Sequence, residues 1–173
     1  MCNIIEGKLE FIFPDGWQAL KLDGTEFYRK HFQNFADSKC VDIASFQANG
    51  GELWLIEVKD YRINRRTKTL DLFDELALKI RDSLALLFLA KCKPEINSFN
   101  FAQKAADKPK IRVVLHLEQP ANPSRLYPPV VDRGNARLKL KQAVRVVDSH
   151  PLFCEMSAMP HDCPWVVEPM SED

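Results

Sequence analysis

The spacing of hydrophobic and polar positions changes several times along the chain, and each change predicts a different element. Residues 8–13 and 17–22 are short apolar runs separated by the Pro14-Asp15-Gly16 turn, which is typical of two strands. Phe27, His31 and Phe35 then recur every four residues after Thr25, a residue type that often caps helices. This spacing predicts a helix over residues 25–36.

Two apolar runs, residues 40–46 and 52–61, surround Asn49-Gly50-Gly51 and predict a β-hairpin. A two-residue Asn49-Gly50 turn places Asp42 directly opposite Glu57. A Gly50-Gly51 turn places Asp42 opposite Lys59 on the same face of the sheet. A three-residue loop without a bulge moves Asp42 to the other face, so the face that Asp42 shares depends on the turn.

The second half of the chain predicts fewer regular elements. Asp71 caps a long helix that ends at about Lys91, and a loop continues to Pro109. Residues 111–117 form a β-branched run typical of a buried strand. Residues 135–147 fit either a helix or a strand, and the last 25 or so residues, with four prolines, are expected to be irregular. The order helix, hairpin, helix, strand predicts one α/β domain over residues 1–173, with a mixed central sheet flanked by helices.

Composition narrows the classes of function. The chain has 24 basic and 24 acidic residues, so its net charge is zero and any nucleic-acid partner must be held by a local patch. The apolar runs are too short to span a bilayer, so no membrane partner is expected. Five widely spaced cysteines do not suggest a disulfide framework, and we expect a reducing, cytoplasmic setting.

The charged residues of the hairpin suggest a metal site. Two carboxylates that meet on a half-buried sheet face repel each other, and a divalent cation relieves that repulsion. Asp42 and Glu57 are the candidate ligands for Mg²⁺ or Mn²⁺, with the carbonyl of Val58 as a further oxygen. Lys59 is placed to orient a metal-bound water or to stabilise negative charge on a phosphoryl group.

Asp42, followed after a turn by Glu57-Val58-Lys59, resembles the D…(D/E)xK signature of the restriction-endonuclease-like (PD-(D/E)xK) nuclease superfamily. The resemblance covers about residues 25–118, which leaves a proline-rich C-terminal extension, and Val41 stands where the family often has proline. It implies the restriction-endonuclease-like fold and a hydrolase that cleaves DNA with Mg²⁺. It assigns metal binding to Asp42 and Glu57, catalysis to these two and Lys59, and a further acid to Glu26.

A basic segment, residues 59–68, follows the candidate metal site. Tyr61 is a candidate for stacking on a base, and the candidates for holding a phosphate backbone are Arg62, Arg65, Arg66 and Lys68. The alternative is a solvated loop. A second basic cluster consists of Arg133, Arg137, Lys139, Lys141 and Arg145, and it also fits a solvated helix face.

Three functions fit these features. The first is a metal-dependent DNA endonuclease, acting alone or as a homodimer. The second is a catalytically inactive module on the same fold that binds nucleic acid or a partner protein. The third is a zinc-dependent interaction protein that uses His150, Cys154, His161 and Cys163, residues that carry zinc-ligating atoms at an unusual spacing.

Overall fold

The computed structural model describes residues 2–64, 66–120 and 129–170. Its elements, in chain order, are β1 (Cys2–Glu6), β2 (Leu9–Phe13), β3 (Trp17–Lys21), the π-helix η1 (Tyr28–Phe32), β4 (Ile43–Gln47), β5 (Glu52–Asp60), α1 (Leu72–Lys91), α2 (Phe99–Ala106), β6 (Lys110–Glu118), α3 (Arg133–Val144), β7 (Leu152–Cys154) and β8 (Val166–Pro169).

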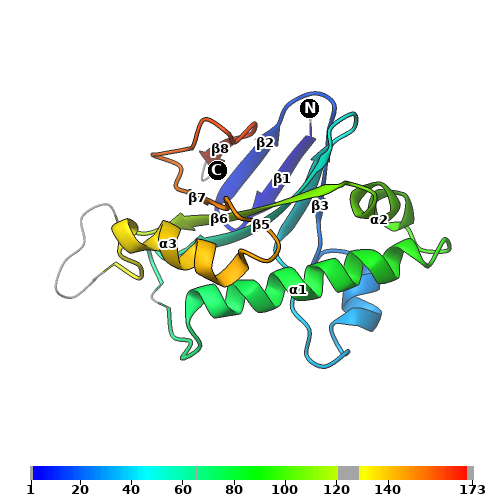
Figure 1. Ribbon diagram of the computed structural model, residues 1–173, viewed down its shortest axis with the longest axis horizontal. Coiled ribbons are helices and arrows are strands. Elements are labelled where there is room, and N and C mark those ends of the chain that lie inside the picture. Colours follow the sequence, from blue (N-terminus) through cyan, green and yellow to red (C-terminus); the bar gives the residue numbers. More distant parts are fainter. Residues whose placement is uncertain (1, 65, 121–128, 171–173) are drawn as a thin grey trace.

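A five-stranded mixed sheet forms the centre of the molecule (Figure 1). Its order is β3-β4-β5-β6-β7, with antiparallel pairs from β3 to β5 and parallel pairs from β5 to β7. Helices α1 and α2 lie on the connection from β5 to its parallel neighbour β6, because a parallel pair needs a crossover connection. The α/β class predicted from the sequence is therefore confirmed.

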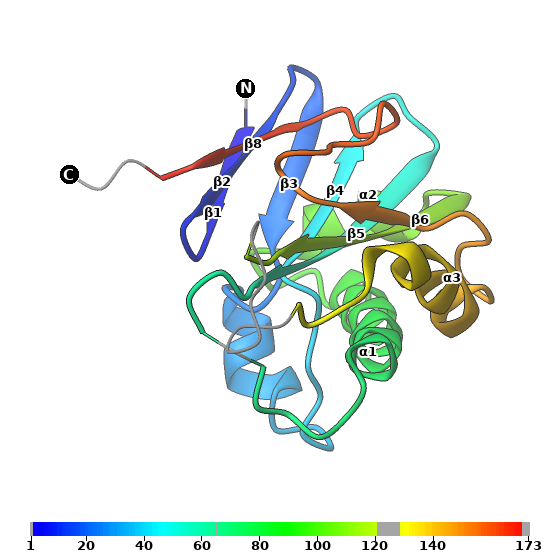
Figure 2. The ribbon, with the colours of Figure 1, turned by 90° about the vertical axis from the view of Figure 1, so that its left-hand side faces the viewer.

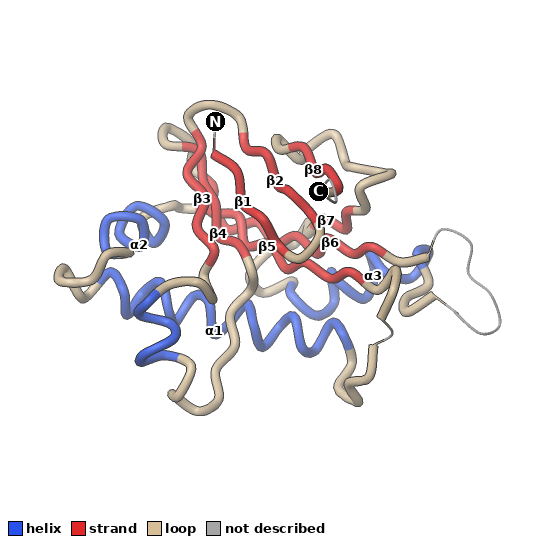
Figure 3. The backbone as a smooth tube through the Cα atoms, turned by 180° about the vertical axis from the view of Figure 1, so that it is seen from behind, coloured by secondary structure: helices blue, strands red, loops and turns tan. Residues whose placement is uncertain are grey.

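The two faces of the central sheet are covered differently (Figures 2 and 3). The helices lie on one face, and the three-stranded sheet β1-β2-β8 lies over the other. Successive side chains of β5 alternate between these layers. Leu53 and Leu55 pack in the helix-side core, whereas Trp54 and Ile56 pack against the small sheet.

Local sequence signals predicted the central elements well. Asp71 caps α1, and its side chain accepts a hydrogen bond from the backbone N–H of Phe73. In the hairpin, Ile43 pairs with Ile56, which is the register expected for an Asn49-Gly50 turn. The turn itself differs, because the backbone N–H of Gly50 donates to the carbonyl of Gln47 and closes a turn one residue earlier. The strand pairing begins at Ile43, so Asp42 lies just outside it, and its side chain accepts a hydrogen bond from the backbone N–H of Val58. The observed register is one of the two alternatives that place Asp42 on the face of Glu57 and Lys59.

Other elements differ from the prediction. The first helix is the short π-helix η1 rather than the three turns expected over residues 25–36. The loop expected before Pro109 contains α2, and residues 135–147 lie largely in the helix α3. The C-terminal residues are not simply irregular, because β7 joins the central sheet and β8 pairs with β2. Within the described residues, none of the helices is long and apolar enough to cross a membrane.

Candidate functional site

The hairpin brings Asp42, Glu57 and Lys59 together on the helix-facing side of the central sheet. Asp42 lies just before β4, and its Oδ2 accepts a hydrogen bond of 2.7 Å from the backbone N–H of Val58. Glu57 and Lys59 are two residues apart in β5, and they form an ion pair. All three side chains are largely buried, so this is a compact charged cluster inside an apolar layer.

Lys79 of α1 completes the cluster, and the sequence interpretation missed it. Its Nζ donates a hydrogen bond of 2.6 Å to Oε1 of Glu57 and lies 3.8 Å from Oδ1 of Asp42. The available signal was a lysine beside the buried positions Leu76 and Ile80 of an otherwise apolar helix face. A charge on such a face needs a partner, and the paired carboxylates are that partner.

Burial sets the ionisation of this cluster. The side chain of Glu57 is only 1% exposed, and this burial, with the nearby charge of Asp42, raises its pKa to about 7. Burial opposes the charged form of Lys79, but Glu57 and Asp42 outweigh it and raise the pKa of the ammonium group. The carboxyl group of Glu57 therefore titrates near neutral pH, and the ammonium group of Lys79 beside it stays charged.

These contacts do not favour the expected magnesium site. The Oε1 atom of Glu57 faces the ammonium groups of Lys59 and Lys79, so two cations already balance the two carboxylates. Across residues 2–64, 66–120 and 129–170, no group of three or more His, Cys, Asp or Glu side chains could hold a metal ion. The structure therefore gives no support to Mg²⁺ or Mn²⁺ at Asp42, Glu57 and Val58.

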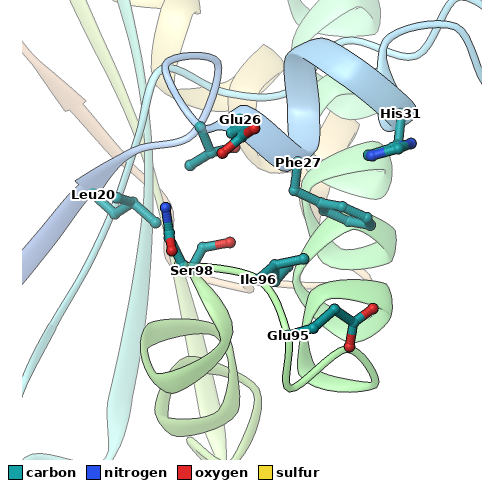
Figure 4. Close-up of a pocket in the computed structure, with 9 residues that line it drawn as sticks. Leu20, Glu26, Phe27, His31, Glu95, Ile96 and Ser98 are labelled. Carbon is teal, nitrogen blue, oxygen red and sulfur yellow. The ribbon is translucent and has the colours of Figure 1, made fainter.

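Glu26, the predicted additional ligand, lies elsewhere. It is exposed on the segment that enters η1, and it pairs with Lys30. It lines a cavity between this segment and residues 95–98, with a volume of about 350 Å³. Figure 4 shows Glu26 at this cavity. Phe27 and Ile96 form apolar walls of this cavity, and His31 and Glu95 also line it, but Asp42 and Glu57 do not.

The basic segment after β5 is held by carboxylates of the same chain. Arg62 forms a bidentate pair with Asp60. Arg66 donates to Glu75 and to the Tyr61 hydroxyl, and Lys68 also pairs with Glu75. Arg65 lies outside the described residues. Arg62, Arg66 and Lys68, the predicted phosphate-binding residues, are therefore paired with carboxylates of the same chain. Tyr61 packs against the helix-side core.

Helix α3 presents a different basic surface. Ala136, Leu140 and Val144 form its buried stripe. An exposed basic residue directly follows each of them in the sequence. We call these three residues, Arg137, Lys141 and Arg145, the α3 basic face. Residues 133–147 contain no acid. The charges of the α3 basic face therefore reach solvent with little local compensation.

The C-terminal histidines and cysteines do not converge. Cys154 and Cys163 lie with their Sγ atoms 3.3 Å apart. His150 instead makes a hydrogen bond through Nδ1 with the hydroxyl of Ser149, and His161 is exposed. The predicted four-residue zinc set is therefore not assembled in the part of the chain that the structure describes.

Comparison with known proteins gives a match to a ligase. The chain is 31% identical, over an alignment 215 positions long, to a cysteine–tRNA ligase of Neisseria meningitidis serogroup A, and the alignment covers 99% of this chain. The chain spans only 30% of the length of that ligase. No family model matches the chain, and no solved structure matches it.

This similarity corrects the expected function. The relative is an enzyme that joins cysteine to tRNA, as its name states, and it is not a DNA nuclease. The prediction of a Mg²⁺-dependent DNA endonuclease is therefore wrong. Asp42, Glu57 and Lys59 lie together, as two of the three hairpin registers require. The catalytic roles assigned to them depended on the nuclease activity and are not carried further.

Proposed function

We propose that this chain is a non-cleaving tRNA-binding module, related to part of a cysteine–tRNA ligase, that acts in the cytoplasm. The observation that carries the proposal is the α3 basic face, on a chain that aligns along nearly its whole length with a protein named for its action on tRNA. The module would hold the phosphate backbone through α3.

The spacing of the α3 basic face suits a phosphate backbone. Arg137, Lys141 and Arg145 follow one another at intervals of four residues, so their attachment points are about 6 Å apart along one flank of the helix. Lysine and arginine side chains bind phosphate through charge and displace condensed counterions, without reading the sequence. Such a surface fits the backbone of a folded RNA.

The difference from the segment after β5 supports the choice of surface. Arg62, Arg66 and Lys68 must break ion pairs within the chain before they can bind phosphate. Among the described residues, no such ion pair holds Arg137, Lys141 or Arg145. Exposed cations without an ion-pair partner have no such interaction to break when they bind phosphate, so α3 is the favoured contact surface.

The test replaces the whole α3 basic face by glutamine, with Arg137→Gln, Lys141→Gln and Arg145→Gln in one variant. We expect binding to unmodified tRNA to weaken at least tenfold in low salt. We also expect the slope of log affinity against log salt concentration to fall by about one for each phosphate that the variant no longer neutralises. Fluorescence anisotropy over a salt series measures both quantities.

A variant of matched charge controls for net charge. Arg29, Lys93 and Lys104 are exposed basic residues on other parts of the surface, and their replacement by glutamine removes the same three charges. It should change the affinity for tRNA little. Equal weakening in both variants, or unchanged binding in the α3 variant, would show that α3 is not the RNA contact. Thermal unfolding of each variant establishes that the fold is intact.

We propose in addition that the central sheet has the restriction-endonuclease-like arrangement, without its nuclease activity. The antiparallel strands β3, β4 and β5, the long crossover helix α1 and the parallel strand β6 support this assignment. A fold can carry unrelated functions, because function depends on the residues of its sites.

A further inference from the structure

Cys154 and Cys163 form a pair of thiols that neither the fold nor the proposed function explains. Their Sγ atoms are 3.3 Å apart, and one thiol donates a hydrogen bond to the other. Cys154 is the last residue of β7 and is fully buried, whereas Cys163 is partly exposed. The pair therefore has one accessible member and one buried member.

The two thiols also differ in acidity. The hydrogen bond from Cys154 lowers the pKa of Cys163, and the guanidinium group of Arg112 acts in the same direction. The hydrogen bond to Cys163, together with burial, raises the pKa of Cys154. Cys163 is thus the better nucleophile, and Cys154 keeps its proton beside it.

A disulfide between Cys154 and Cys163 would affect the structure because of where the two residues lie. Cys154 belongs to the central sheet, and Cys163 stands two residues before Trp165, which fills the core beneath the small sheet. Trp165 leads directly into β8, the strand that pairs with β2. A covalent bond between the two sulfur atoms fastens the C-terminal strand to the central sheet.

We propose that Cys154 and Cys163 form a reversible redox site, at which a small disulfide such as oxidised glutathione converts the two thiols into an intrachain disulfide. This inference concerns a different part of the molecule from α3 and does not depend on RNA binding. Disulfides in a reducing compartment are usually transient, which suits a site that responds to oxidant.

The chemistry proceeds in two exchange steps. The Cys163 thiolate attacks one sulfur of oxidised glutathione, forms a mixed disulfide and releases one glutathione thiolate. Cys154 then attacks the Cys163 sulfur, and the second glutathione leaves with the proton that Cys154 gives up. Overall, two protein thiols are oxidised and one glutathione disulfide is reduced to two glutathione molecules.

The experiment uses the full chain with Cys2→Ser and Cys92→Ser, which removes the other two cysteines that are not buried. Oxidised glutathione should produce a chain lighter by two hydrogen atoms, and peptide mapping should show residues 154 and 163 joined. The reaction should be roughly tenfold or more faster in the folded protein than in urea, because the fold holds the thiols together. Oxidation should raise the Tm by roughly 5 °C, a shift that dithiothreitol reverses.

Single substitutions in this background separate the two roles. Cys154→Ser should stop at the mixed disulfide and retain one glutathione, whereas Cys163→Ser should react slowly because its remaining thiol is buried. The proposal is overturned if both thiols persist after equilibration with excess oxidised glutathione. It is also overturned if the bond forms equally fast in urea, or if it leaves the Tm unchanged.

Discussion

Glu57 is the residue whose surroundings are most unusual. Its Oε1 atom pairs with the ammonium groups of Lys59 and Lys79, but its buried Oε2 atom has no hydrogen-bond partner among the residues that the structure describes. Ionised carboxylates that are buried with an unpaired oxygen are costly, and protonation of that oxygen relieves the cost. The pKa of about 7 results from burial, which raises it, and from the two lysines, which lower it.

This balance predicts how stability depends on pH. The pKa of Glu57 rises from 4.5 to about 7 on folding, so between these values the folded state binds more protons than the unfolded state. Stability should therefore fall as the pH rises from 4.5 to 7, by about 3 kcal/mol in total from this group. Glu57→Gln should flatten that slope, as measured by urea unfolding at several pH values.

The comparison of slopes makes this test specific. Glu52→Gln, in the same strand, removes a carboxylate that pairs with Lys110 at the surface, and it should leave the slope close to that of the unaltered protein. If Glu57→Gln leaves the slope unchanged, the carboxyl group is ionised across this range and the account of its burial is incorrect.

At the scale of elements, the first turn of α1 orders the segment that follows β5. Glu75 accepts a hydrogen bond from Arg66 and pairs with Lys68, which brings two cations of the preceding segment to the first turn of the helix. Burial opposes the charged form of Glu75, but these two partners lower its pKa to about 2. The ion pairs therefore tie residues 66–70 to the start of the helix.

Replacement of Glu75 by glutamine should release this segment. We expect a loss of about 2 kcal/mol in the free energy of unfolding, because two cations lose a charged partner. Trypsin should also cleave faster at Arg66 and Lys68 under native conditions. Limited proteolysis followed by mass spectrometry measures the second effect, and urea unfolding measures the first.

Asp74→Asn is the matched control, because Asp74 is an exposed carboxylate in the same turn. It should cost well under 1 kcal/mol, the usual size of a helix-dipole effect, and leave cleavage unchanged. Equal cleavage in both variants would mean that the helix end, rather than the Glu75 ion pairs, controls the segment.

The elements that could be predicted from the sequence are those with local signals. The Asp71 cap depends on neighbouring residues, so the start of α1 followed from the chain alone. The Asn49-Gly50 pair predicted the hairpin but left three registers open, of which the structure has one. Strand β8 depends on pairing with β2, more than 150 residues earlier, and no local pattern reveals such a partner.

The candidate site, too, was predicted only where it depends on local signals. Two of the three registers considered bring Asp42, Glu57 and Lys59 to one face, and the structure has one of these two. Lys79 was missed because its position depends on how α1 packs on the sheet. The partners of Arg66 and Lys68 were missed for a similar reason, since the path of the segment before α1 brings them to Glu75.

At the scale of the whole molecule, the central sheet is shared by two cores. Its helix-side face packs against α1, and its other face packs against the small sheet. All three tryptophans, Trp17, Trp54 and Trp165, meet in the second layer, with ring centroids 5.2 to 6.4 Å apart. Tryptophan fluorescence therefore reports on one core and far-ultraviolet circular dichroism mainly on the helices of the other.

Because both cores use the same strands, we expect them to unfold together. Trp165 is 3% exposed, and Trp165→Ala should lower the free energy of unfolding by about 3–5 kcal/mol and the Tm by roughly 10 °C. The transitions followed by fluorescence of Trp17 and Trp54 and by circular dichroism should shift by the same amount. Val166→Ala, at an exposed neighbour, should shift neither. If the fluorescence transition moves alone while the helices keep their original midpoint, the small sheet is a separate folding unit rather than the second half of a shared core.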